Sequence, residues 1–169
     1  MGNRCVITTA SDRSNNFGVY LHWNGGRDSV EAFLAYCKLK EYRSPDIDCY
    51  GWARLCQVIG NFFGGDTSIG FDLSNRLDCD NYDNGVFLIQ DWEIVGRQYQ
   101  RRGEQMEHDF KEMLHEINEQ QPQQEQLERH VIDAFCEKRL QQIHTAPEQP
   151  EHNKNAPSKS KKSKTHDVR

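Results

Sequence analysis

The run His22-Trp23-Asn24-Gly25-Gly26-Arg27-Asp28 has the residue types that an anion-binding turn needs. An alternating apolar stretch before it predicts a strand, and an apolar stripe at helical spacing follows it. A glycine turn between a strand and a helix directs free backbone N–H groups toward one point, where an anion can bind. Arg27 would add a charged fork of donors, and His22 a titratable group.

The same run also has a purely structural interpretation. Gly25-Gly26 permits a tight turn, and Asp28 with Glu31 three residues later has capping-box spacing. Trp23 continues the apolar face of the strand and is predicted to point into the core. The turn lacks the glycine fingerprint of a P-loop or a dinucleotide fold. Both interpretations remain open at this stage.

A second candidate site is the acidic turn Asp78-Cys79-Asp80-Asn81-Tyr82-Asp83-Asn84-Gly85. The carboxylates of Asp78, Asp80 and Asp83 are hard oxygen ligands of the kind that Ca²⁺ or Mg²⁺ takes. The EF-hand register fails, because Tyr82 falls on a ligand position and no Glu stands at the last one. Asp and Asn are also ordinary turn residues.

The chain has six cysteines, none in a Cys-x-x-Cys pair and none clustered with histidines at zinc-site spacing. We expect reduced thiols that mostly act as packing groups. A Cys79/His22 nucleophile pair stays open, because such pairs form by folding rather than by sequence spacing. No cofactor is expected. The cysteines are Cys5, Cys37, Cys49, Cys56, Cys79 and Cys136.

The charge is unevenly distributed along the chain. From Asn153 onward, six basic residues against one acid give +5, so subtraction from the net −5 leaves −10 for residues 1–152. An acidic body repels phosphate backbones, whereas a basic tail attracts them nonspecifically. A solubilising tail is the alternative. The lysines that would contact nucleic acid are Lys159, Lys161, Lys162 and Lys164.

Composition narrows the class of protein. The 169 residues have a mean hydropathy of −0.90 and 36% hydrophobic residues, concentrated before about position 95. No stretch approaches the ~20 apolar residues of a membrane span, and the first residues lack the apolar core of a secretory signal. We therefore expect a cytoplasmic protein without a membrane segment.

The hydrophobic pattern predicts an α+β fold, an antiparallel sheet of two hairpins packed with two helices. Asp48, or Ser44-Pro45, starts the second helix, and Gly64-Gly65 ends it. Asn84-Gly85 is the hairpin signal between the last two strands. The predicted strands are residues 4–10, 17–23, 67–73 and 86–95, and the first helix is residues 29–41.

From Gly103 the chain turns charged and glutamine-rich, and two thin apolar stripes separated by Pro122 predict a helical hairpin. Its faces either dock on the sheet or pair two copies into a homodimer. The first stripe is Met106, Phe110, Met113, Leu114 and Ile117, and the second is Leu127, Val131, Ala134 and Phe135. We divide the chain into a core (1–98), a helical extension (99–143) and a disordered basic tail (144–169).

Roughly the first hundred residues resemble a family of small proteins of phages, prophages and plasmids, which share a Met-Gly-x-Arg start and a Trp-Asp/Asn-Gly turn. The resemblance brings no catalytic residues. It implies an accessory protein that binds and blocks a host factor, such as restriction or CRISPR machinery. It rests on Met1-Gly2-Asn3-Arg4-Cys5-Val6-Ile7, Tyr20-Leu21-His22-Trp23-Asn24-Gly25-Gly26, Gly51-Trp52-Ala53-Arg54-Leu55, Ile59-Gly60-Asn61-Phe62-Phe63-Gly64-Gly65 and Asp91-Trp92-Glu93-Ile94-Val95.

Two functions therefore stand as expectations. The first is a non-enzymatic protein-binding factor of a mobile genetic element, an inhibitor of a host defence or nucleic-acid-handling protein. The second is a small enzyme or an anion- or nucleotide-binding protein that uses the turn at residues 22–28. In that case Trp52, Arg54 and Asp80 would converge on the turn.

Overall fold

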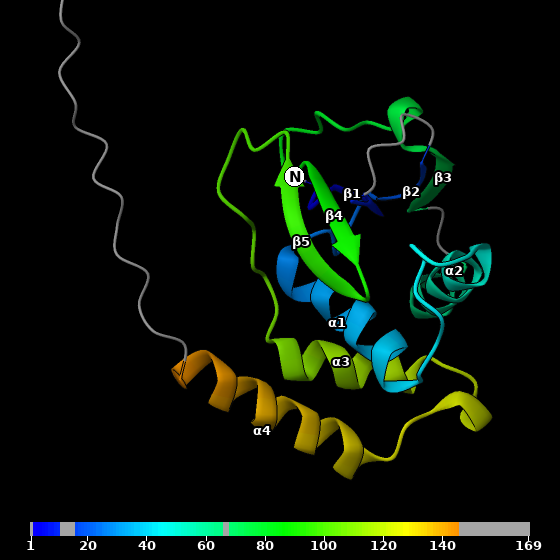
Figure 1. The fold of residues 1–169 in the computed structure, drawn as a ribbon, viewed down its shortest axis with the longest axis vertical. Coiled ribbons are helices and arrows are strands. Elements are labelled where there is room, and N and C mark those ends of the chain that lie inside the picture. The colour runs from blue at the N-terminus through cyan, green and yellow to red at the C-terminus, as the bar shows by residue number, and fades with distance from the viewer. Residues whose placement is uncertain (1, 11–15, 66–67, 146–169) are drawn as a thin grey trace, which may run out of the picture.

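A computed structural model describes residues 2–10, 16–65 and 68–145 (Figure 1). It confirms the α+β class. The strands are β1 (Cys5–Thr9), β2 (Phe17–Leu21), β3 (Ile69–Leu73), β4 (Val86–Gln90) and β5 (Glu93–Gln98). The helices are α1 (Arg27–Leu39), α2 (Cys49–Phe63), α3 (Phe110–Glu119) and α4 (Arg129–Thr145), and the 3-10 turns are η1 (Ser74–Arg76) and η2 (Gln123–Glu125).

The five strands form one mixed sheet in the order β3-β2-β1-β4-β5. The predicted first hairpin, β1 with β2, is confirmed. The expectation of a purely antiparallel sheet is wrong, because β1 and β4 run parallel. β3 pairs with β2, and the second hairpin joins β4 to β5 through Asp91 and Trp92, both at positive φ.

Asn84-Gly85 therefore does not close a hairpin between β3 and β4. Gly85 has a φ of +71°, and a Cβ there would lie 2.7 Å from the carbonyl oxygen of Tyr99. Its backbone N–H donates to Oδ1 of the buried Asn81 (3.0 Å). Gly85 is therefore needed where the chain passes close to the backbone at Tyr99, and not for a two-residue loop. For this reason the predicted pairing of β3 with β4 is wrong.

The central strand β1 is covered on both faces of the sheet. The register places Ile7 level with Val19 of β2 and Phe87 of β4, and all three side chains lie in the core with α1. On the other face the β3–β4 connection crosses the sheet, and the Leu77 side chain packs at Gly18 of β2. All five residues of β1 are buried, and the strand begins with three consecutive apolar residues, as expected for a strand covered on both faces.

The ends of α2 confirm two predictions. The Asp48 side chain accepts from the backbone N–H groups of Tyr50 and Gly51, and Gly64 ends the helix at a φ of +62°. At α1 the prediction that Asp28 caps the helix is wrong. Gly26 is the N-cap residue and has no side chain, so the buried Asp28 lies inside the first turn.

The C-terminal helices extend the same core. Figure 1 shows α1 between the sheet and α3, with α4 antiparallel to α3 on the far side. Asp109 caps α3, whose predicted stripe is buried from Met113 to Ile117, whereas Met106 is exposed ahead of the helix. On α4 the buried side chains are Ile132 and Cys136; Ala134 is exposed, so that part of the predicted stripe is wrong.

Within the described residues, none of the helices has the length and apolar character needed to cross a membrane.

Candidate functional site

The predicted turn after β2 is packed against the start of β1. Asn24 adopts a φ of +54°, and the N–H of Gly25 donates to the carbonyl of Asn3 (2.8 Å). A Cβ at Gly25 would lie 2.6 Å from that carbonyl oxygen and 2.7 Å from the backbone nitrogen of Cys5. Gly25 is therefore required by close backbone contact, as the structural interpretation of this turn assumes.

The segment before α3 covers the start of α1. Arg27 donates to Glu104 through Nε and Nη2 (2.5 and 2.7 Å) and pairs with Glu31 (3.1 Å). The hydrogen bond to Glu104 raises the pKa of Arg27. The Asp28 carboxylate accepts from the backbone N–H of His108 (2.6 Å). The place where an external anion would meet Arg27 already holds the protein's own carboxylates.

The two aromatic residues of the turn lie at the surface. Trp23 is 42% exposed, so the prediction that it points into the core is wrong. β2 ends at Leu21, and the chain leaves the sheet before the alternation reaches Trp23. The His22 ring packs edge-on to Trp23 (centroids 4.8 Å apart), and its Nδ1 lies 3.5 Å from the Tyr20 hydroxyl.

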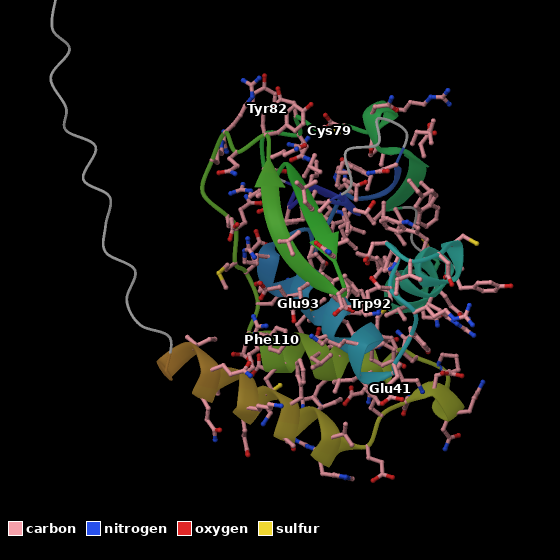
Figure 2. All side chains as sticks on the ribbon, viewed as in Figure 1. Glu41, Cys79, Tyr82, Trp92, Glu93 and Phe110 are labelled. Carbon is pink, nitrogen blue, oxygen red and sulfur yellow. The ribbon has the colours of Figure 1, made fainter. Side chains whose placement is uncertain are left out.

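Trp52 and Arg54 have their ring partners elsewhere. Trp52 packs edge-on to Phe17 of β2, with ring centroids 5.0 Å apart. The Arg54 guanidinium lies 5.3 Å from the centre of the Tyr42 ring, at a hollow of about 350 Å³ beside Tyr50. Figure 2 shows Tyr82, at the acidic turn, at the opposite end of the molecule from Glu41, which lines this hollow. These contacts of Trp52 and Arg54 do not include the turn at residues 22–28.

The acidic turn is organised by hydrogen bonds and arginines. Asp83 is buried and accepts from the backbone N and Nε of Arg4 (3.2 and 2.6 Å). Asp80 accepts from Arg101 Nε (2.6 Å), while the Asp78 carbonyl accepts from the Asn81 amide. Across residues 2–10, 16–65 and 68–145, no group of three or more His, Cys, Asp or Glu is placed to hold a metal. Asp78, Asp80 and Asp83 are therefore not gathered into such a group there, and a metal site at this turn stays a prediction.

Four of the thiols, those of Cys5, Cys37, Cys56 and Cys79, are poorly suited to nucleophilic chemistry. Burial raises the pKa of Cys56 to about 11 and also raises the pKa of Cys5 and Cys37. Cys79 donates to the carbonyl of Ser74 (3.1 Å). Its pKa is raised by burial and by Asp78, which keeps the thiol protonated at neutral pH. The tail lysines Lys159, Lys161, Lys162 and Lys164 lie outside the described residues.

The structure does bring together a surface that sequence reasoning missed, a groove of about 410 Å³ between the β4–β5 hairpin and α4, with α1 beneath. We call it the α1/α4 groove. Figure 2 shows Trp92 and Glu93 at the end of the hairpin that borders it. Its apolar residues are Leu34 and Ala35 of α1, Trp92 and Ile94 of the hairpin, and Phe135 and Ile143 of α4.

Fixed contacts hold the three walls of the groove in place. The Trp92 indole N–H donates to the carbonyl of Tyr42 (2.8 Å), which fastens the hairpin turn to the connection after α1. On α4, Arg139 donates to Glu31 of α1 and lies 4.2 Å from the centre of the Phe110 ring. The groove is therefore defined by tertiary contacts between segments that are distant in the sequence, such as Tyr42 with Trp92 and Glu31 with Arg139.

The rims of the groove carry charges that neutralise one another. Lys38 pairs with Glu93 (2.6 Å), and Arg139 pairs with Glu31. The residues that line the groove include no Ser, Thr, Cys, His, Tyr or Asp, and the Lys and Glu side chains that line it are held in these ion pairs. Its chemistry is apolar burial between neutralised rims, which suits binding.

One sequence signal could have pointed to this surface. The α4 stripe continues from Ile132 and Cys136 to Leu140 and Ile143 at helical spacing, yet Leu140 and Ile143 are 56% and 59% exposed. The stripe therefore continues beyond the residues that bury it and leaves two apolar side chains exposed on α4.

Comparison of the chain with protein-family profiles, with curated proteins and with solved structures finds no match.

Proposed function

We propose that the protein is a non-enzymatic protein-binding factor whose α1/α4 groove receives an apolar segment of a partner protein. The observation that carries this proposal is the lining of the groove, which combines six apolar residues with two internally paired rims. A partner that buries apolar side chains there leaves no rim charge without its ion-pair partner, so no uncompensated charge opposes the gain from apolar burial.

An amphipathic helix is the segment that fits best. The groove lies between two helices and a hairpin, a setting in which a ligand helix can place apolar residues at i, i+3 and i+4 spacing. Exposed Leu140 and Ile143 extend the apolar surface beyond the groove along α4. Apolar surface that continues past a pocket and is rimmed by charge is typical of protein contacts rather than of small-molecule sites.

The class of partner is inferred from the sequence. The resemblance to phage, prophage and plasmid proteins leads us to propose an accessory role on a mobile genetic element. In that role, the protein would inhibit a host defence or nucleic-acid-handling protein. The strongly acidic body, at −10 over residues 1–152, supports a partner with a basic surface.

Affinity capture from bacterial lysate with two matched variants tests the proposal. Ile143→Asp places a charge in the groove at an exposed position, and Tyr50→Asp makes the same change at an equally exposed position on α2. We expect a stoichiometric partner with the wild type and with Tyr50→Asp, and its loss with Ile143→Asp. Equal recovery by all three proteins, or no stoichiometric partner with any, would contradict the proposal.

A further inference from the structure

The hollow of about 350 Å³ beside Tyr42 is a second concave surface, built by the connection from α1 to α2 and the first turns of α2. Figure 2 shows Glu41, one of its lining residues, just past the end of α1. None of its residues lines the α1/α4 groove, so its role is independent of the proposed function. The hollow is lined by Glu41, Tyr42, Arg43, Tyr50 and Arg54.

Arg54 gives the hollow a cation that has no acidic partner. Its guanidinium donates to the Gln57 side chain (3.0 Å) and lies 5.3 Å from the centre of the Tyr42 ring. Among the described residues no carboxylate forms an ion pair with it, whereas the neighbouring Arg43 pairs with Asp48 (3.0 Å). Since a guanidinium offers a fork of donors that matches phosphate oxygens, Arg54 is suited to bind an anionic group of a ligand.

Glu41 gives the hollow an acceptor that is also unpaired. Its side chain is exposed, and within residues 2–10, 16–65 and 68–145 no donor bonds to it. Its backbone has a φ of +54°, in the left-handed region that a residue of this kind rarely adopts. An ionised carboxylate only accepts hydrogen bonds, so Glu41 is suited to ligands that present N–H groups.

Two tyrosine rings add flat surface to the hollow. Tyr50 is 67% exposed, and the Arg43 guanidinium lies 5.6 Å from its ring centre. Tyr42 is held in place, because its hydroxyl donates to Glu125 (3.1 Å) and its carbonyl accepts from the Trp92 indole (2.8 Å). A planar heterocycle such as a nucleobase stacks on rings of this kind.

A ligand that uses these features combines an anion, a planar ring and N–H donors on the edge of that ring. We propose that the hollow binds a guanine mononucleotide, with its phosphate on Arg54, its ring on Tyr50 and its base edge on Glu41. On guanine the N1–H and the exocyclic amine point the same way, so both donate to one carboxylate. Adenine presents one amine beside an acceptor nitrogen, which a carboxylate repels.

Two observations favour a mononucleotide over other anions with a ring. Glu41 and Arg54 line one hollow without pairing, so a ligand must separate its donors from its anion. The ribose of a nucleotide provides this separation, whereas an aromatic amino acid has both charges on one carbon. Residues 1–152 carry −10 and repel the successive phosphates of a nucleic-acid strand, so a single nucleotide is favoured.

Isothermal titration calorimetry of the full chain tests the site with guanosine monophosphate (GMP), adenosine monophosphate (AMP) and phenylalanine. We expect GMP to bind, AMP to bind at least ~10-fold more weakly, and phenylalanine to give no measurable heat. A wild type that does not bind GMP, or that binds AMP or phenylalanine as tightly, overturns the proposal. A short guanine-containing oligonucleotide that binds more tightly than GMP also overturns it, because the ligand would then be a strand.

Matched variants locate the site. Arg54→Ala and Glu41→Gln should each raise the Kd for GMP at least ~10-fold, and Glu41→Gln should also reduce the preference for GMP over AMP. The same changes at two exposed positions outside the hollow, Arg102→Ala and Glu107→Gln, should leave the Kd unchanged. If Arg54→Ala or Glu41→Gln binds GMP as the wild type does, the assignment of the hollow is wrong.

A glycine variant separates binding from folding. Glycine adopts a φ of +54° without strain, so Glu41→Gly should unfold at a urea concentration at least as high as the wild type. It lacks the carboxylate and should bind GMP as weakly as Glu41→Gln does. Wild-type affinity for GMP in this variant would show that Glu41 does not receive the base, and the proposal would fail.

Discussion

The turn at residues 22–28 and the α1/α4 groove differ in almost every property that defines a binding site. The turn has the polar residues and the glycines, yet its Arg27 and Asp28 are held by Glu104 and by the backbone of His108. The groove has no sequence motif, yet it is open and about 410 Å³ in volume. The polar groups of a motif-like turn can thus all be bonded within the protein itself. An open surface can instead be lined by apolar residues that belong to no motif.

The largest effect is expected in the turn. In Gly25→Ala the new Cβ would meet three backbone atoms at 2.6 to 2.8 Å, belonging to Asn3, Arg4 and Cys5. Backbone cannot move aside as the end of a side chain can, so we expect a loss of about 3 kcal/mol in the free energy of unfolding. Urea denaturation measures it. Gly103→Ala, with no atom within 4 Å of the new Cβ, is the control and should change stability little.

A smaller, pH-dependent effect is expected at the cover of the turn. The hydrogen bond from Arg27 lowers the pKa of Glu104, so the ionised carboxylate stabilises the fold at neutral pH. This stabilisation is complete above the ordinary Glu pKa and disappears as pH falls through the lowered value. At pH 7, Glu104→Gln should cost about 0.5–1 kcal/mol, as expected for a partly exposed ion pair.

The difference between wild type and Glu104→Gln should shrink as pH falls below about 4. Urea denaturation at several pH values follows it, with the exposed neighbour Glu107→Gln as the control. If the difference in unfolding free energy stayed constant down to acid pH, Arg27 would not be paired with Glu104. The turn would then be open to ligands, contrary to the comparison with the groove.

The smallest effect concerns ligands of the turn. Arg27 is already paired, so inorganic phosphate, nucleotides and divalent ions should raise the melting temperature of the wild type no more than that of Arg27→Ala. The same melting-temperature comparison with Arg54→Ala tests separately whether these ligands bind in the hollow at Tyr42. A nucleotide that raises the melting temperature of the wild type but not of Arg27→Ala would contradict this expectation. The turn would then be a ligand site, and the alternative function of an anion- or nucleotide-binding protein would be favoured.

The sequence by itself determined the local elements of this protein. The alternation of Phe17, Val19 and Leu21, the Asp48 cap and the Gly64 end each depend on residues a few positions apart, and the structure has all of them. Periodicity and capping are local, so one sequence suffices to find them. The predicted site at residues 22–28 was found only in part. The turn itself is present, but its Arg27 and Asp28 are held by other groups of the protein and are not open to a ligand.

Tertiary structure alone decided which strands pair, what covers the turn and where the groove opens. The parallel pairing of β1 with β4, the contact of Glu104 with Arg27 and the placement of Trp92 and Phe135 around one groove each join segments more than forty residues apart. Such contacts depend on how the apolar faces of distant elements pack together, and no short stretch of sequence records that.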